Sequence, residues 1–366
     1  ALTAAWLAFL AWAGLFAGSP IGIGDFISFD GGSLLSLEGQ AFEIRFSLGL
    51  DGLGLAFVGA TTLLTLAGLL ADPGPTGRRG GGYYCLVLLL EAGLLGTFLA
   101  RDVVLFHLFA EWATICLFLL IGIWGNRHRR ASALKLLIFG SCGGLAVLTG
   151  LLAMALWNYP ATGRITTSLG ELTAGLAQSP IPPGPQTVIL LLLVFGLAAK
   201  SGVFPLHGWL PTAIAEAPTA TGIILAGAAI EVGGYGLLRF GRVLLPDAMA
   251  ACSIWLSWLF VAGIILGAIM AMLQSDLRRL AGFACVSQTA LCMLGIVRAD
   301  NPAVGGGVLK LTVGGLAMGG LLSLLAVMHD RADLGRSESL DLDRWRRPML
   351  LTLIVLLSAA NLGMPG

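Results

Sequence analysis

Charged side chains are scarce in this chain. Only 11% of its 366 residues are Asp, Glu, Lys or Arg, whereas 57% are hydrophobic. A soluble domain carries about 25% charged residues, and the mean hydropathy here is +0.90. The composition therefore excludes a water-soluble globular domain and indicates a polytopic membrane protein.

Motifs for cofactors, nucleotides and metals are also lacking. The six cysteines lie singly in apolar runs without CxxC spacing, which argues against a metal site or a disulfide framework. No Walker motif, strand–GxGxxG–helix unit, haem-attachment motif or iron–sulfur motif occurs, so most of the 52 glycines are expected to let helices pack closely. We therefore expect no cofactor or metal in this chain. We also expect no nucleic-acid partner, because the basic run 127–130 is typical of a membrane flank.

Long apolar stretches predict an all-α multi-pass fold. The first and last stretches are cut by the chain ends, so we expect a fragment that lacks at least a first helix and a C-terminal portion. The polar segment 18–51 is expected to lie outside the membrane, and the alternation at 42–46 predicts a short strand within it. The eleven predicted spans are 1–17, 52–72, 83–100, 103–124, 131–157, 187–204, 219–238, 250–273, 280–297, 304–328 and 348–366.

Arginines are distributed unequally between the two sets of loops. One alternating set holds twelve arginines and the other holds six. The positive-inside rule places the richer set in the cytoplasm and the segment 18–51 outside. Arg239 and Arg242 go against this rule. The expected location is the inner membrane of a bacterium.

The chain repeats itself at an offset of about 175 residues, which spans five helices. An odd number of helices inverts the second unit relative to the first, as in transporters whose ion sites lie at broken helices. The matching features are an aspartate before a helix (Asp102, Asp276), a lysine between leucines (Lys135, Lys310) and a proline interruption (Pro205, Pro365). The predicted units are 1–82 with the N-terminal helices and outward loop, 83–249 as the first repeat and 250–366 as the truncated second repeat.

All three lysines lie inside predicted spans, while the eighteen arginines lie at segment ends or in loops. A charge at membrane depth costs about 3 kcal/mol on insertion scales and usually marks a pathway. A buried lysine can gain and lose a proton, whereas an arginine cannot. Each such charge could instead pair with a neighbour only to fix helix packing, but a series of alternating Glu and Lys favours a proton relay. The series is Glu111, Lys135, Lys200, Glu231 and Lys310, with Glu91 as a sixth member.

Lys200 has the most informative context. It precedes the run 201–211, in which two prolines and two glycines break helical hydrogen bonding. The freed backbone groups need water, which predicts a wet pocket beside the lysine. Glu111 is the natural partner, because an ionised glutamate holds Lys200 protonated and separation of the two releases the proton. His207 either carries a proton to the surface or simply hydrogen-bonds the loop backbone.

The runs 106–112 and 199–211 resemble the fifth helix and the most diagnostic broken-helix segment of the antiporter-like subunits of complex I. The Gly-Ile-Trp-Gly ending at 122–125 is most similar to subunit M, or chain four, of NADH–quinone oxidoreductase. The resemblance implies a fourteen-helix fold, of which this chain is the second helix through part of the twelfth. It also implies proton translocation driven by quinone reduction elsewhere. NADH, FMN, iron–sulfur clusters and quinone are then expected in partner subunits, with sibling antiporter-like subunits on either side.

In that comparison Glu111 falls on the family's essential glutamate and Lys200 on its essential lysine. Glu231 departs from the pattern, because the family has a lysine there. Gln288 and Gly314 depart as well, since they replace histidines. These departures keep other functions open: a subunit of a cation/proton antiporter or of a membrane-bound hydrogenase, or a membrane scaffold with an impaired proton path.

The predicted relay has three parts. Its first, proton-switching pair is Glu111 with Lys200. Glu231 and Lys310 continue the hydrated axis toward the C-terminal end, and Lys135 and His207 are secondary.

Overall fold

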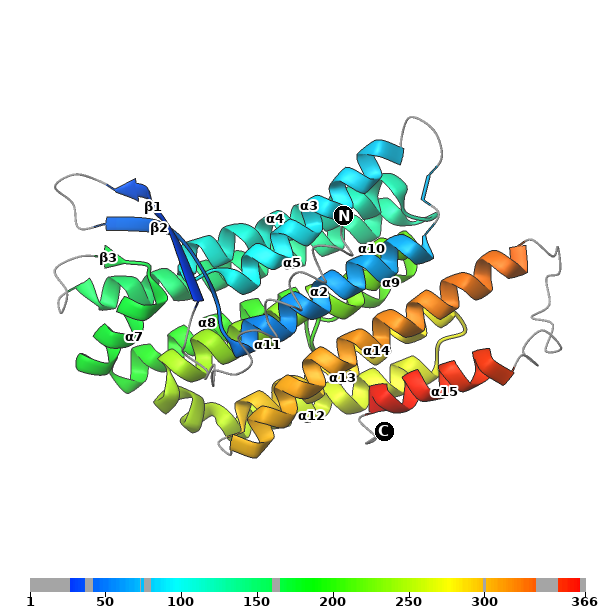
Figure 1. The fold of residues 1–366 in the computed structure, drawn as a ribbon. Coiled ribbons are helices and arrows are strands. Elements are labelled where there is room, and N and C mark those ends of the chain that lie inside the picture. The colour runs from blue at the N-terminus through cyan, green and yellow to red at the C-terminus, as the bar shows by residue number, and fades with distance from the viewer. Residues whose placement is uncertain are drawn as a thin grey trace.

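A computed structural model describes residues 27–36, 42–72, 74–75, 80–159, 165–298, 301–333 and 348–362. Long helices lie side by side in a bundle, with a small sheet at one end (Figure 1). Nine helices in the described part are long and apolar enough to cross a membrane, which confirms the predicted multi-pass helical fold. They are α2 (Gly52–Ala71), α3 (Gly80–Leu99), α4 (Val103–Trp124), α5 (Arg129–Trp157), α8 (Pro183–Ser201), a composite helix Thr219–Arg242, α12 (Pro246–Met272), α13 (Leu277–Val297) and α14 (Asn301–Asp333).

The predicted spans between 52 and 328 each correspond to one of these helices. Their ends move by a few residues, as where 187–204 becomes Pro183–Ser201. The predicted span 1–17 lies outside the described residues. At the other end of the chain α15 covers Pro348–Leu362, and its apolar part, Thr352–Asn361, is shorter than a membrane crossing needs. Two short helices that the sequence did not predict are α7 (Leu169–Gln178) and α9 (Leu210–Glu216).

The composite helix has two π-helical segments. It runs through α10 (Thr219–Ile224), η2 (Leu225–Ala229), α11 (Glu231–Gly236) and η3 (Leu237–Arg242). Most of this helix is buried by its neighbours, unlike α12, whose surface is mostly open. Single π-turns inside helices are frequent at functional positions. Glu231 begins α11, two residues after the end of the first of them.

A three-stranded sheet covers one end of the bundle. β1 (Ile27–Ser36) pairs antiparallel with β2 (Phe42–Leu50), and β2 pairs parallel with β3 (Ile165–Thr166). The strand predicted at 42–46 is therefore confirmed. Asp102 ties this sheet to the helices, because its carboxylate accepts the Thr167 hydroxyl (2.5 Å) and caps α4 at the Val104 N–H (2.9 Å). Asp276, its predicted repeat partner, likewise caps a helix: its carboxylate accepts the Arg278 N–H (2.9 Å) at the start of α13.

Arg239 does not lie at the surface. It is buried in η3, where its guanidinium donates to Asp51 (2.5 Å) and to the Tyr235 hydroxyl (3.2 Å). Arg239 lies in the last turn of the composite helix, so the prediction that arginines lie at segment ends or in loops holds for it, but its side chain is buried. Its pairing also explains why Arg239 goes against the arginine distribution: the positive charge is neutralised inside the protein by Asp51, at the start of α2.

Candidate functional site

The break after α8 positions the central lysine. Lys200 is the last residue but one of α8, and the helix ends at Gly202, whose φ of +64° is in the left-handed region. The chain then passes through a cis peptide at Phe204–Pro205 and enters α9 at Leu210. The Trp209 indole N–H donates to the Ala199 carbonyl (2.9 Å), so one of the freed backbone groups is satisfied by a side chain. The interruption predicted at Pro205 is present.

Lys200 and Glu111 form a buried ion pair. The Lys200 ammonium donates to Glu111 Oε1 (2.7 Å) and to the Thr114 hydroxyl (3.3 Å). The lysine side chain is 6% exposed and that of the glutamate 21%, so the pair is closed on the Lys200 side and partly open on the Glu111 side. Glu111 and Thr114 share one face of α4, because they are three residues apart. The predicted contact between Glu111 and Lys200 is thus present, and its role in proton transfer stays a prediction.

A small cavity lies beside this pair. It has a volume of about 30 Å³, and Thr114, Gly140, Lys200 and Trp209 are among its lining residues. A cavity of this size holds a water molecule when polar groups face it. The ammonium and the Thr114 hydroxyl supply such groups, which fits the predicted wet pocket.

Two further polar residues, which the sequence did not indicate, lie next to Glu111. Ser141 on α5 donates to Glu111 Oε2 (3.4 Å). His107 is buried one turn before Glu111 on α4, and both side chains lie against Gly144 of α5. The spacing of four residues between His107 and Glu111 could have indicated that they share a face. Ser141 could not have been identified that way, because it lies on another helix.

Close helix packing around the pair depends on glycine. A Cβ at Gly143 of α5 would lie 2.7 Å from the Gly196 carbonyl oxygen of α8, so the two helices approach backbone to backbone. At Gly144 a Cβ would occupy the position of Glu111 Oε1. The first glycine brings Lys200 close to α5, and the second leaves room for the carboxylate that holds it.

Gly144→Ala is therefore expected to displace the Glu111 carboxylate from Lys200 without unfolding the helix pair. The added methyl meets the end of a flexible side chain, which can rotate away, rather than backbone. Overpacking of this kind costs about 1–3 kcal/mol of stability. Because the displaced Glu111 no longer holds Lys200 protonated, we expect a clear fall in the rate of ion translocation. The measurement is the initial rate of ion uptake by reconstituted vesicles. Gly122→Ala on α4 is the matched control, since its Cβ would make an ordinary contact with Ala133 (3.6 Å). Equal losses in both variants would show that the site is not specifically affected.

Glu231 occupies a different position from the first pair. It is 1% exposed, and among the described residues neither of its carboxyl oxygens has a hydrogen-bond partner. Its side chain lies against Gly315 of α14 and beside the Gly227 carbonyl. Ser201, which follows Lys200, donates to the carbonyl of Ile230, which precedes Glu231 (2.6 Å). This hydrogen bond joins the break in α8 to the break in the composite helix.

Lys310 lies where α13, α14 and α15 meet. Its ammonium and the Gln288 side-chain amide both donate to the Asn361 carbonyl. A Cβ at Gly314 would lie 3.7 Å from the ammonium, so the position where the family resemblance implies a histidine adjoins Lys310. Lys310 and Glu231 form no ion pair with each other in the described part of the chain.

The remaining predicted residues lie outside the paired site. Lys135 is exposed on the outer face of α5, so the prediction that all three lysines are interior is wrong for it. The His207 ring packs on Phe204 (5.7 Å) and Phe283 (6.3 Å) in the turn after α8, with no hydrogen bond to Lys200 in the described ranges. Glu91 is buried in α3 at 6% exposure. Across the described residues no group of three or more His, Cys, Asp or Glu side chains could hold a metal ion.

The fold and the site define a class of protein: a polytopic membrane protein in which a buried ion pair lies at a broken helix. The family described as NADH:quinone oxidoreductase/Mrp antiporter, transmembrane, matches residues 100–366. The chain belongs to this family, and the family resemblance seen in the sequence is confirmed.

Individual relatives agree with this assignment. NADH-quinone oxidoreductase subunit M of Pseudomonas aeruginosa is 32% identical over 337 residues, which are 89% of this chain, and the chain spans 65% of that relative's length. Respiratory complex I from Thermus thermophilus contains a chain with a TM-score of 0.83 and 27% identity; the match covers all of this chain and 74% of that one. The Mrp complex from Dietzia sp. DQ12-45-1b contains a chain with a TM-score of 0.70 and 28% identity, and the match covers 90% of this chain and 34% of that one.

Proposed function

We propose that this chain is a proton-translocating subunit of a quinone-reducing respiratory complex in a bacterial inner membrane. The observation that carries the proposal is the 2.7 Å pair between Lys200 and Glu111 at the end of a broken helix. Buried ionisable pairs beside broken helices are expected where ions cross a membrane. The chain itself carries out no redox step. NADH, FMN, iron–sulfur clusters and quinone bind in partner subunits, and sibling antiporter-like subunits lie on either side.

The pair works as a switch. While Glu111 is ionised and in contact, it stabilises the protonated form of Lys200. A buried ammonium without its counter-ion costs several kcal/mol, so movement of Glu111 away drives the proton off the lysine. Glu111 is the movable member, because its side chain is the more exposed of the two and, among the described residues, hydrogen-bonds only Ser141 and Lys200. A neighbouring subunit that alters the position of Glu111 would therefore control the lysine proton.

Glu231 receives the proton next in this scheme. The hydrogen bond from Ser201 to the Ile230 carbonyl brings the two helix breaks together. A carboxyl group without hydrogen-bond donors is more stable neutral than charged in a buried site, so Glu231, once it has passed its own proton on to Lys310, readily takes the proton that Lys200 releases. Lys310 then continues the path in the second repeat. The division into repeat units 83–249 and 250–366 belongs to this proposal, with Lys135 and His207 outside the main path.

A cation/proton antiporter subunit is the second candidate. The likeness to a chain of the Mrp complex and the presence of Gln288, which hydrogen-bonds the carbonyl that Lys310 also binds, favour this candidate. A glutamine cannot carry a proton, so a cation other than a proton would then cross the second repeat.

One experiment separates the two candidates. The complex that contains the full-length subunit is purified, its partner subunits are identified, and it is reconstituted into vesicles. Proton and sodium movements are followed with separate dyes while NADH and quinone are supplied. We expect proton movement that depends on quinone reduction and continues without sodium. Proton movement that occurs only against a sodium gradient, without quinone chemistry, would overturn the respiratory assignment in favour of the antiporter.

A further inference from the structure

One face of α5 is exposed along most of its length. Its residues are three or four positions apart, so they form a single stripe on the helix. The basic members lie at the N-cap and in the first turns of α5, and the members that follow Lys135 are apolar or weakly polar. In order they are His128, Ala131, Lys135, Ile138, Cys142 and Leu145, all exposed.

Lys135 is the unusual member of this stripe. It lies roughly 10 Å along the helix from His128, inside the span Arg129–Trp157, and its side chain faces away from the protein. Within the described residues no carboxylate pairs with it. A long lysine side chain can run back along the helix so that its ammonium reaches the membrane surface. An ammonium at the membrane surface without a carboxylate partner in the described residues can be neutralised by an anion from outside the chain.

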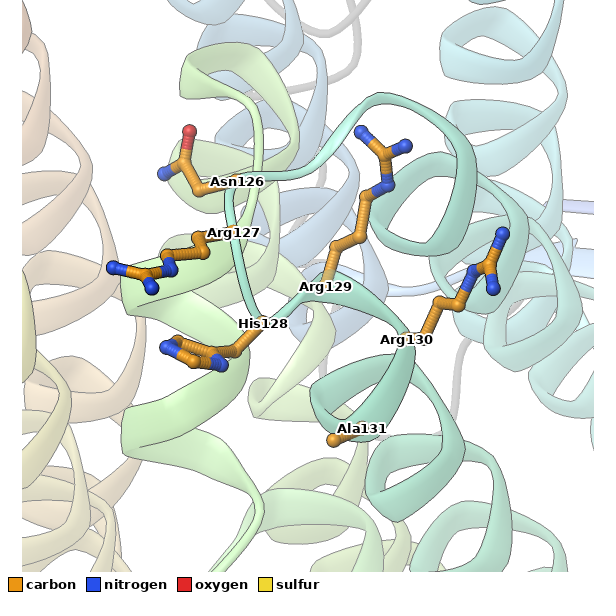
Figure 2. Close-up of a pocket in the computed structure, with 6 residues that line it drawn as sticks. All are labelled: Asn126, Arg127, His128, Arg129, Arg130 and Ala131. Atoms are coloured by element: carbon orange, nitrogen blue, oxygen red, sulfur yellow. The ribbon is translucent and has the colours of Figure 1, made fainter.

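The loop before α5 brings further cations to the same level. Residues 126–131 line an open hollow of about 670 Å³, and the exposed side chains of Arg127, His128, Arg129 and Arg130 surround it. Figure 2 shows that Arg127 and His128 project to the same side of the loop, whereas Arg129 and Arg130 project in other directions. Glu216 accepts the His128 backbone N–H (2.8 Å) and so fixes the loop through its main chain. The imidazole of His128 is not used in that contact.

We propose that this face binds an anionic phospholipid. Arg127, His128 and Lys135 hold the phosphate, and an acyl chain lies along Ile138, Cys142 and Leu145. Clusters of basic residues at the end of a membrane helix bind anionic headgroups through charge complementarity. The apolar part of the stripe fits a hydrocarbon chain, because Ile138 and Leu145 are 59% and 62% exposed. This site is separate from the ion pair at Lys200, so it does not depend on the proposed function.

The test uses the native cysteine on this stripe as a reporter. The full-length chain is labelled with a fluorophore at Cys142, after the other accessible cysteines, Cys85 and Cys252 among them, are replaced by serine. It is placed in nanodiscs that contain brominated phosphatidylglycerol or brominated phosphatidylcholine with the same acyl chains. We expect half-maximal quenching at a much lower fraction of the anionic lipid. Each Lys or Arg contributes about fivefold at a membrane surface, so Arg127→Gln/Lys135→Gln should weaken the preference about 30-fold.

Two variants make the result specific. Lys135→Arg keeps the charge and should retain the preference. Arg279→Gln removes another exposed arginine from the first turn of a membrane helix, α13, and should change nothing. Equal quenching by both lipids in the unsubstituted chain would overturn the proposal. So would a photo-crosslinker at Ile138 that captures a protein subunit instead of lipid in native membranes, because the face would then be a subunit interface.

Discussion

We expect Lys200→Met to abolish ion translocation while the complex still assembles. Methionine has a similar length and is apolar, so it fills the space of Lys200 without a buried charge. Glu111 then loses its strongest partner but keeps the Ser141 hydroxyl and an exposed edge, which limits the structural damage. Groups that transfer protons directly contribute on the order of 10²-fold or more, and we expect a loss of that size in the rate of proton uptake by reconstituted vesicles.

Lys200→Arg distinguishes proton transfer from charge pairing. Arginine keeps the positive charge beside Glu111 but does not release its proton in a protein. It should therefore preserve assembly and fail in translocation. If the arginine variant pumps as well as the unsubstituted complex, residue 200 supplies only a charge and the switch is wrong. Lys135→Met is the matched control, because Lys135 is exposed on α5 and lies outside the site; it should leave translocation near its normal rate.

The site was predictable from sequence where it depends on local chemistry. Prolines and glycines after Lys200 break a helix whatever surrounds it, and the structure ends α8 at that position. Glu111 was identified as the partner because interior charges need counter-charges. Its neighbours Thr114 and Ser141 were not identified, since an ordinary hydroxyl in an apolar helix usually bonds its own backbone, as the hydroxyl of Thr114 also does with the Ala110 carbonyl.

Helix rotation was the information that the sequence argument lacked. In a membrane protein both the lipid face and the protein face of a helix are apolar, so hydropathy does not show which way a residue points. Lys135 was misplaced for that reason. The packing face of α5 is marked by small residues, and Gly140 and Gly144 are both buried. Lys135 is five positions before Gly140, which is roughly 140° around the helix, so the glycine pattern would have placed it outside.

The ion pair between Arg239 and Asp51 was missed for a different reason. The two residues are 188 positions apart, and no local pattern connects them. Arg239 stood out only as an exception in the arginine distribution. That exception now has a cause, since a buried and neutralised arginine does not act as a topology signal. For Arg239 the exception marks a buried partner of opposite charge.

Arg239→Met is expected to be the most destabilising of the substitutions considered. The Arg239 and Asp51 side chains are 8% and 0% exposed, so removal of the cation leaves a carboxylate in a closed site. Breaking a buried pair by removing one partner costs about 3–5 kcal/mol. The Tyr235 hydroxyl, which donates to the Phe98 carbonyl (2.9 Å), also loses its contact with the guanidinium. We expect a clear fall in the thermal midpoint of the detergent-purified complex. The midpoint is measured by size-exclusion chromatography of samples heated to increasing temperatures.

The double variant Asp51→Asn/Arg239→Met tests the cause of that loss. Asparagine removes the stranded charge and still accepts the Gly54 N–H that caps α2, which Asp51 binds at 2.7 Å. Replacement of a whole buried pair by uncharged groups is often nearly neutral, so the double variant should recover most of the stability. If it remains as unstable as Arg239→Met, the loss comes from packing around η3 and not from the unpaired carboxylate. Recovery would mean that the loss in Arg239→Met comes from the unpaired carboxylate of Asp51 at the start of α2.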